Sequence, residues 1–350
     1  MSLRPTLQDI ATAAGVAAST VCRALRNDRR IPASTQERIR EIAENLGYRP
    51  DPLLSALSLR RQGKSGSAEI TTIAYIDNNR GRILGEQEYG FREACWAGAK
   101  TRAEELGYRL EAFHIGNREL SERRLSQILY TRGIIGVCIA PLVSARGHLK
   151  LDWEKFACAA IGYTLVRPSL HRAAAHHYQS ILLALREMRR LGYQRIAVFL
   201  DEATSRRVDD IWLAGVLLYA RRYPKMHFPV LVKSGSVTDP AFCRMVVSWY
   251  RKQKPDAIIG NTAFRRILEA EGIRFPQDAA YAGLYRIHQY DGLIACVDQR
   301  TEQIAGTAID LVIEQIQKNE RGIPISPKTV LVTGQWQPGS SAQPKSRSRL

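Results

Sequence analysis

Short apolar strands alternate with amphipathic helices along most of this 350-residue chain, and this alternation constrains the fold more than any other feature. Continuous apolar runs are typical of buried parallel strands, and parallel strands need long, usually helical connections. The pattern predicts strands at residues 70–76, 110–114, 134–140, 157–161, 196–200, 257–259, 280–284 and 295–297. It predicts helices at residues 91–106, 178–191, 209–222 and 301–318. The region is too long for one sheet, so we expect two α/β lobes with parallel, doubly wound sheets.

The first 50 residues follow a different pattern, with three short helical segments joined by turns. Thr6 and Asp9 form a capping box that begins the first helix. Gly15 supplies a turn before a second helix at about residues 18–26, and a second capping box at residues 34–37 predicts the start of the third. Apolar residues at helical spacing are expected to face inward from the third helix: Ile39, Ile42, Ala43 and Leu46. This order of helices and turn is the helix-turn-helix arrangement.

The second of these helices has one polar and one apolar face. The polar face carries Ser19, Cys22, Arg23 and Arg26, and the opposite face carries Val21, Ala24 and Leu25. Small side chains permit close approach to a DNA groove, and arginine can donate to guanine O6 and N7. A solvated face with ordinary charges is the alternative. The two flanking helices and the glycine turn favour a helix that reads the major groove.

On these residues the chain resembles the LacI family of bacterial transcription regulators. The matching stretches are Thr6-Leu-Gln-Asp-Ile-Ala11, Ala14-Gly-Val16, Ser19-Thr-Val21, Arg23-Ala-Leu25, Arg38-Ile39 and Leu46-Gly-Tyr-Arg-Pro50. The resemblance continues in a weaker form to about residue 339, and it implies a homodimer that binds double-stranded operator DNA. By position it implies base contacts from Ala18, Ser19, Cys22 and Arg23, and phosphate contacts from Thr6, Thr20 and Tyr48. Ala17 stands where the family usually has the serine cap of the recognition helix.

Residues 51–67 begin with a leucine-rich segment and end as a basic, flexible linker. The leucine-rich segment, residues 52–61, is too short to hold as an isolated helix in water. The resemblance implies a hinge helix that orders on DNA and inserts Leu57 into the minor groove, where an apolar wedge can kink the duplex. The family commonly has Ala-Arg where this chain has Leu54-Ser55. Packing of these leucines in the core is the alternative.

The α/β region resembles periplasmic sugar-binding proteins and would bind a small polar effector. Ligands in open α/β sheets bind beyond the carboxyl ends of the strands. The candidates at those ends are Asp77, Asn78, Tyr89, Phe91, Arg207, Asn261, Tyr285 and Gln299. This sequence departs from the family pattern at His176-His177, Asp210, Thr262 and Tyr285. Each candidate is as consistent with a structural role as with ligand binding.

Composition narrows the class of protein further. A net charge of +17 favours a polyanionic partner, although an acidic membrane surface or ligand would also fit. No apolar stretch reaches the ~20 residues of a membrane span, and no signal-peptide pattern begins the chain. The six cysteines form no CxxC pair, which favours reduced thiols in the cytoplasm. We find no catalytic motif, metal-ligand cluster or cofactor-binding motif in the sequence.

The sequence therefore predicts a helix-turn-helix domain at residues 1–50, a hinge and linker at 51–67, and an effector-binding and dimerisation domain at 68–339. A basic, disordered tail is expected at 340–350. The predicted function is a dimeric transcription repressor that binds a palindromic operator. An activator or an effector-independent regulator is the alternative within this class. A small-molecule binding protein and a sugar or nucleotide enzyme are the rivals from other classes.

Overall fold

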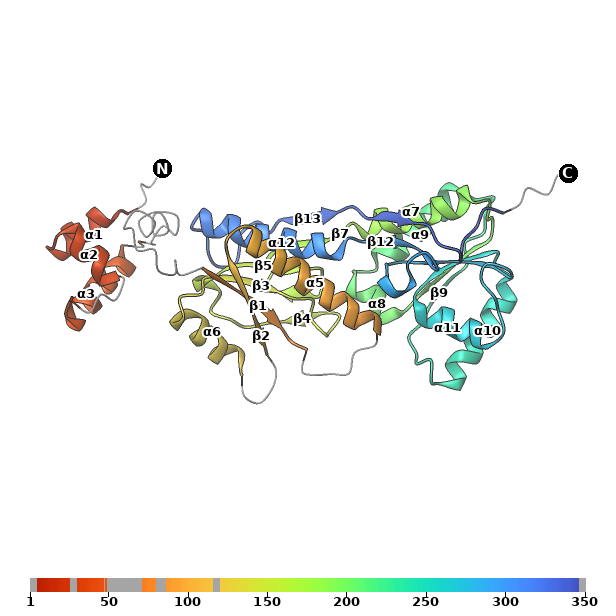
Figure 1. The fold of residues 1–350 in the computed structure, drawn as a ribbon, viewed down its shortest axis with the longest axis horizontal. Helices are drawn as coiled ribbons and strands as arrows, with labels where there is room; N and C mark the ends of the chain where they lie inside the picture. The colour runs from red at the N-terminus through yellow and green to blue at the C-terminus, as the bar shows by residue number, and fades with distance from the viewer. Residues whose placement is uncertain are drawn as a thin grey trace. The chain divides into compact units, whose positions relative to one another are not determined.

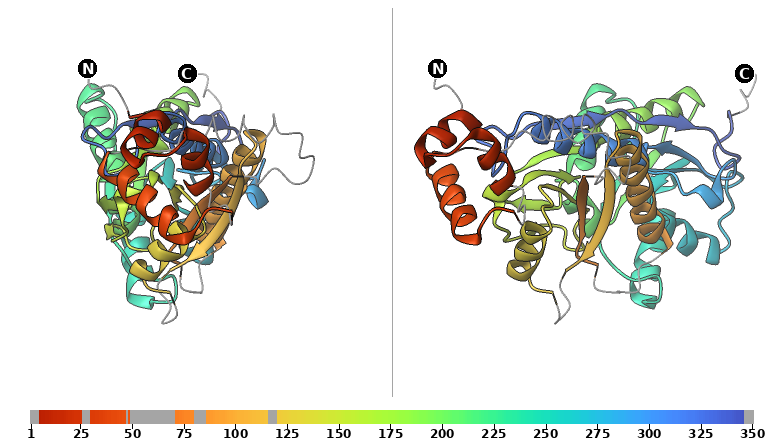
Figure 2. Two further views of the ribbon diagram at one scale, coloured as in Figure 1. Left: turned by 90° about the vertical axis from the view of Figure 1, so that its left-hand side faces the viewer. Right: turned by 60° about the vertical axis from the view of Figure 1, so that its left-hand side comes forward.

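The computed structural model describes residues 5–25, 30–46, 48, 71–79, 86–115 and 120–345. The chain divides into two compact units, one of residues 1–68 with 317–319 and one of residues 69–316 with 320–350. We describe each unit by itself. Figures 1 and 2 show the first as a small group of helices and the second as helices packed on two sheets.

The small unit contains α1 (Leu7–Ala14), α2 (Ala18–Leu25) and α3 (Ala33–Asn45). These helices share one core, formed by Ile10, Ala11, Ala14, Val21, Ala24, Ile39 and Ala43. The capping box at Thr6 and Asp9 is present, and Gly15 has the left-handed backbone (φ 64°) that ends α1. The expected capping box at residues 34–37 is wrong, because α3 already begins at Ala33. Leu46 is 42% exposed rather than inward, since the helix has ended before it.

The α/β unit contains two six-stranded sheets. In spatial order, the first has β13 (Thr329–Val332), β7 (His171–Ala175), β5 (Ala157–Ile161), β3 (Gly136–Ile139), β1 (Thr72–Asp77) and β2 (Arg109–His114). The second has β14 (Gln335–Gln337), β12 (Ala295–Asp298), β11 (Ala280–Gly283), β10 (Ala257–Gly260), β8 (Ile196–Leu200) and β9 (Val230–Val232). A short parallel pair, β4 (Gly147–His148) and β6 (Leu165–Arg167), lies apart from both.

Helices cover both faces of each sheet. The helices over the first sheet are α5 (Glu86–Glu105), α6 (Glu122–Thr131) and α12 (Thr301–Gln317). Those over the second are α7 (His177–Arg190), α9 (Ile211–Arg222), α10 (Pro240–Gln253) and α11 (Thr262–Ala270); α8 (Glu202–Arg207) precedes α9. Along β1, Ile73 and Tyr75 pack with α5 and α12, whereas Ala74 and Ile76 pack with α6. Alternation between two apolar faces explains why the strands are continuous apolar runs.

Three connections pass between the sheets and so define two lobes. The chain crosses from β7 into α7, from β12 into α12 and from β13 into β14. Short 3-10 turns occur at Trp153–Lys155 and His288–Tyr290. This architecture confirms the expected helix-turn-helix unit, followed in the sequence by a pair of parallel-sheet lobes. One edge differs, because β14 runs antiparallel to β12.

Two sequence expectations need correction in this unit. The helix expected at residues 209–222 is α9, but it begins only at Ile211, because Asp209 and Asp210 before it adopt positive φ angles of 56° and 55°. The tail expected to be disordered from residue 340 is packed through residue 345. Ser341 is only 4% exposed, and its hydroxyl donates to the Tyr281 carbonyl at 2.7 Å. Residues 346–350 lie outside the described residues.

Among the described residues, no helix is both long and apolar enough to cross a membrane.

Candidate DNA-binding and effector sites

Helix α2 presents the face that the sequence predicts. Ser19 and Arg23 are exposed and Cys22 is half-buried, whereas Val21 and Ala24 are fully buried in the shared core. Ala18 and Thr20, also expected to contact DNA, are half-buried on the same helix. Arg26 lies outside the described residues. The buried positions fix the rotation of α2 about its axis and leave a small, polar surface facing outward.

The turn between α1 and α2 is held by backbone and side-chain hydrogen bonds. The Val16 amide donates to the Ala11 carbonyl at 3.1 Å, and Arg38 of α3 donates from Nη2 to the Ala14 carbonyl at 3.3 Å. Arg38 thereby satisfies a carbonyl that the end of α1 leaves open. Ala17 precedes α2 and offers no side-chain acceptor to the first amides of that helix.

The proposed phosphate contacts Thr6 and Tyr48 also have structural roles. The Thr6 hydroxyl accepts from the Asp9 amide at 3.3 Å and donates to the Asp9 carboxylate at 2.7 Å. Hydrogen bonds from the Thr6 backbone and hydroxyl hold the pKa of Asp9 below its usual value. Tyr48 is half-buried against the helix-turn-helix core. Leu57, the expected minor-groove wedge, lies outside the described residues.

Asp77 and Asn78 follow β1 at its carboxyl end, as expected, and both are bound to other parts of the protein. The Asp77 carboxylate accepts from Arg92 of α5 at 2.8 Å, and only 8% of the Arg92 side chain is exposed. Asn78 Oδ1 accepts from the Val143 amide at 2.9 Å. Phe91, on α5, is 36% exposed. Tyr89 falls in α5, but its side chain lies outside the described part of the chain.

Arg207 brings the second lobe into contact with the first. It ends α8, and its Nη1 donates to the Val143 carbonyl at 2.8 Å. Asn78 and Arg207, one from each lobe, therefore hold the amide and the carbonyl of the same residue. A second contact between the lobes joins Arg146 Nη1 to Asp209 Oδ1 at 3.2 Å. The structure thus assembles these predicted residues at the junction of the lobes.

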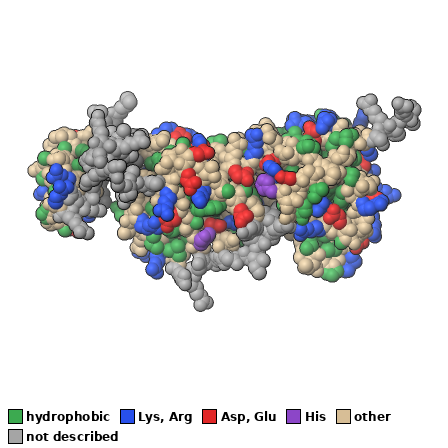
Figure 3. Space-filling model, in the orientation of Figure 1, with side chains coloured by type: hydrophobic (Ala, Val, Ile, Leu, Met, Phe, Trp, Pro, Cys, Tyr) green, Lys and Arg blue, Asp and Glu red, His purple; other side chains and the backbone are tan. Residues whose placement is uncertain are grey.

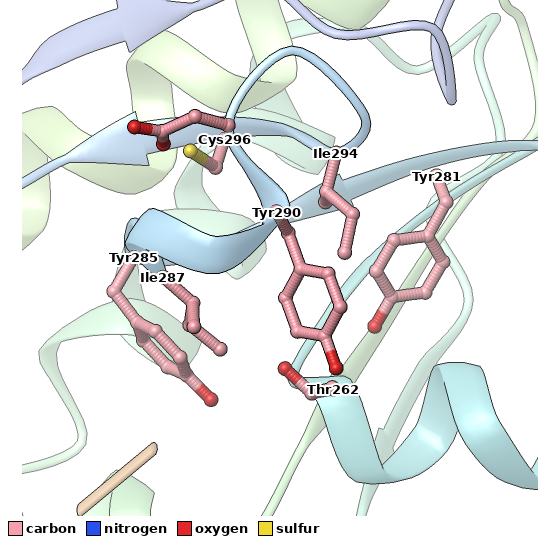
Figure 4. Close-up of a pocket in the computed structure, with 8 residues that line it drawn as sticks. Thr262, Tyr281, Tyr285, Ile287, Tyr290, Ile294 and Cys296 are labelled. Atoms are coloured by element: carbon pink, nitrogen blue, oxygen red, sulfur yellow. The ribbon is translucent and has the colours of Figure 1, made fainter. Parts of the chain in front are cut away.

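The remaining candidates lie at the carboxyl ends of β10, β11 and β12. Asn261 caps α11, its Oδ1 accepting from the Phe264 amide at 3.2 Å. Gln299 is buried and donates to the Leu284 carbonyl at 2.8 Å. Tyr285 lines a cavity of about 20 Å³ (Figure 4), shared with Thr262, Tyr281, Ile287, Tyr290, Asp291, Ile294 and Cys296. This cavity has room for about one water molecule and is too small for a metabolite.

A row of aromatic rings at the junction of the lobes was not predicted from the sequence. Tyr163, which follows β5, has its ring centroid 5.9 Å from that of His177, and His177 lies 5.2 Å from Trp212 of α9. Arg172 of β7 places its guanidinium carbon 6.0 Å from the centroid of the Tyr163 ring. The one sequence signal was His176-His177, where the resemblance leads one to expect Asp-Asn. Tyr163, Arg172 and Trp212 carry no local pattern.

The two adjacent histidines differ in their surroundings. His176 caps α7, its Nδ1 accepting from the Gln179 amide at 3.5 Å. His177 is 8% exposed, and its Nδ1 has no hydrogen-bond partner among the described residues. Burial, together with the neighbouring His176, lowers the pKa of His177 to about 3. His177 is therefore a neutral imidazole at physiological pH.

Known proteins match the chain in both units. Residues 6–51 match the family described as bacterial regulatory proteins, lacI family. The HTH-type transcriptional regulator PtxS of Pseudomonas plecoglossicida is 23% identical over 325 residues, 91% of each chain. PtxS of Pseudomonas putida is 24% identical over 231 residues, 65% of this chain and 63% of that protein.

Solved structures share the fold at low sequence identity. A lac repressor dimer bound to operator and the anti-inducer ONPF superposes with a TM-score of 0.55 at 17% identity. A complex of the transcriptional regulator CelR with cellobiose superposes with a TM-score of 0.54 at 18% identity. Each covers 97% of this chain and 100% of its own.

Proposed function

This chain carries a helix-turn-helix domain of the lacI family, and from that premise we propose that it is a transcription repressor that binds a palindromic operator as a homodimer. The observation that carries the proposal is the outward face of α2. Ser19 and Arg23 are exposed there, whereas Val21 and Ala24 are fully buried in the core. The major groove admits an α-helix. Helix α2 fits it because its rotation about its own axis is fixed by the core and its outward face carries short side chains and one arginine.

The residues of the helix-turn-helix unit take different roles in this proposal. Ala18, Ser19, Cys22, Arg23 and Arg26 contact base edges, and Thr6, Thr20 and Tyr48 contact phosphates. Phosphate contacts fix the orientation of the unit on the duplex, and base contacts supply the sequence preference. Leu57, in the predicted hinge segment, wedges into the minor groove at the operator centre.

The α/β unit is proposed to control DNA binding in response to a small polar metabolite. Support comes from the contacts that Arg207 and Arg146 make between the lobes, since a ligand at this junction would alter them. The CelR structure shows the same fold with cellobiose, and the lac repressor structure shows it with operator and anti-inducer. A change in lobe geometry would bias the hinge segments, which couples the two sites.

An effector-independent regulator is the second candidate, and one observation favours it. Asp77 and Asn78, expected to contact an effector, are bound to Arg92 and the Val143 amide. An activator remains an alternative to a repressor. We place the protein in the cytoplasm, consistent with its six unpaired cysteines. We assign it no enzymatic activity and no cofactor.

Selection from randomised duplex DNA tests the proposal. Purified protein should enrich a two-fold symmetric site. Arg23→Ala should relax the preference at one position in each half-site and weaken operator binding by ~1–3 kcal/mol, because a bidentate contact to guanine is lost. Glu41→Gln, at an exposed position on α3, is the matched control and should keep the base preference. Unchanged preference in Arg23→Ala would show that α2 is not the reading helix.

A further inference from the structure

Buried polar atoms without partners lie in the aromatic row at the junction of the lobes. His177 Nδ1 and Trp212 Nε1 have no hydrogen-bond partner among the described residues, and the two residues are only 8% and 3% exposed. Such atoms are rare in folded proteins, because a donor or acceptor that is buried without a hydrogen bond loses its contacts with water and gains none in return. Two of them lie on adjacent rings, so a further molecule that reached these atoms would supply the missing hydrogen bonds.

His177 lies between the lobes rather than inside one of them. Its ring contacts Tyr163 of the first lobe and Trp212 of the second. The imidazole is neutral, because burial lowers its pKa to about 3, and a neutral imidazole donates from one nitrogen and accepts at the other. Trp212 Nε1 can only donate. This pair suits hydroxyl groups, which both donate and accept.

Arg172 adds a positive charge to the same row. Its guanidinium donates to the carbonyls of Gly162 at 3.4 Å and Leu165 at 3.2 Å, and it lies against the Tyr163 ring. Among the described residues, no carboxylate lies within ion-pair distance of Arg172. The nearby Asp209 is paired with Arg146.

A half-buried guanidinium without a counter-ion is costly, and an anion at its side would offset that cost. Burial also lowers the pKa of Arg172, because the charged form of the guanidinium loses part of its hydration. Carboxylates match the donor geometry of guanidinium groups and can accept two parallel hydrogen bonds. A neutral ligand of equal size would leave the charge unpaired.

We propose that Tyr163, Arg172, His177 and Trp212 bind a small, polyhydroxylated carboxylic acid, with its carboxylate at Arg172 and its hydroxyl groups at His177 Nδ1 and Trp212 Nε1. The aliphatic face of the ligand packs on Tyr163. The inference rests on the proposed function, because it names the effector class of the α/β unit. It also assigns the site to residues of both lobes, so that the ligand holds the lobes together.

Matched pairs of acids and neutral analogues test this site in the full chain. The pairs are D-glucuronate with D-glucose, D-galacturonate with D-galactose, and D-mannonate with D-mannitol, at equal pH and ionic strength. Thermal shift and calorimetry should show that at least one acid binds tenfold or more tightly than its neutral partner. Binding that favours no acid over its partner, or no binding by any acid at millimolar concentration, would overturn the proposal.

Substitutions locate the binding. Arg172→Gln should abolish the preference for the acid, Arg172→Lys should retain part of it, and His177→Phe should weaken binding while keeping the ring. Arg109→Gln, at the exposed amino end of β2, is the matched control and should bind as the wild type does. An acid preference that survives in Arg172→Gln, folded by circular dichroism, would place the carboxylate elsewhere and refute the assignment.

Operator binding, measured on the same preparations, separates this inference from the proposed function. Intact operator binding with no acid preference refutes the ligand site and leaves the regulator. Acid binding without any sequence-specific DNA binding supports the ligand site and refutes the regulator.

Discussion

His176 and His177 show how strongly position decides the behaviour of one residue type. His176 caps α7, whereas His177, the next residue, is buried between two aromatic rings. The first turn of a helix rotates successive side chains by about 100°, so one faces the helix terminus and the other the core. The sequence indicated only that the pair was unusual.

The burial of His177 should make stability depend on pH. Its pKa is about 3 in the folded state and near 6.5 when unfolded, so only the unfolded chain takes up the proton between these values. The free energy of unfolding should fall by about 1.4 kcal/mol per pH unit from this residue as pH drops from 6.5 towards 3. Above pH 6.5 the residue has no such effect.

Urea unfolding from pH 7 to pH 4 measures this effect as the difference between wild type and His177→Phe. The stability of the variant relative to wild type should rise as pH falls. His114→Gln, at an exposed position at the end of β2, provides the comparison and should follow the wild-type profile more closely. A constant difference across this range would show that His177 can be protonated in the folded protein.

At the scale of elements, helices α5 and α12 approach each other unusually closely. They lie side by side over the first sheet (Figure 1), and Arg102 Nε donates to Asp310 at 2.7 Å across the pair. A Cβ atom at Gly98 would overlap the backbone of Glu302. Gly98 is therefore required for the approach of the two helices and not for a turn.

Gly98→Ala should destabilise the α/β unit by ~1–3 kcal/mol, because the helices must separate to admit the methyl group. Gly90→Ala on the same helix is the matched control. A Cβ there would meet no described heavy atom within 4 Å, so higher helix propensity should stabilise the protein by up to about 1 kcal/mol. Thermal unfolding measures both changes. Equal melting temperatures for the two variants would contradict the packing argument.

Elements were predictable from the sequence when they carried a strong local pattern. The boundaries of β5 and β8 agree with the sequence pattern because both are uninterrupted apolar runs. β7, with the sequence His-Arg-Ala-Ala-Ala, was missed because alanine is a poor indicator of a strand. The edge strands β13 and β14 were missed because their pairing is decided by distant neighbours.

At the scale of the molecule, the excess of positive charge should act on DNA without regard to sequence. Figure 3 shows Lys and Arg side chains interspersed with Asp and Glu on one face of the α/β unit, so the net charge of +17 is not gathered there into one patch. Interspersed charges favour weak, non-specific contacts with phosphates and do not form a defined DNA-binding groove.

Affinity for random-sequence duplex DNA should therefore fall steeply with salt, by a factor of roughly 10³ between about 50 and 200 mM if six phosphates are neutralised. Fluorescence anisotropy at a series of salt concentrations measures the slope. Arg23→Ala should change specific binding much more than this non-specific binding. Salt-independent binding would contradict an electrostatic origin.

The sequence by itself determined the two-lobed α/β class, the helix-turn-helix unit and the outward face of α2. Each of these depends on local periodicity and caps, which a short stretch of chain encodes. Only the tertiary structure decided that Asp77 and Asn78 are bound internally. It alone brought Tyr163, Arg172, His177 and Trp212 together at the junction of the lobes. Those contacts join residues distant in the chain, and their partners are chosen by packing and by the need to satisfy buried polar groups.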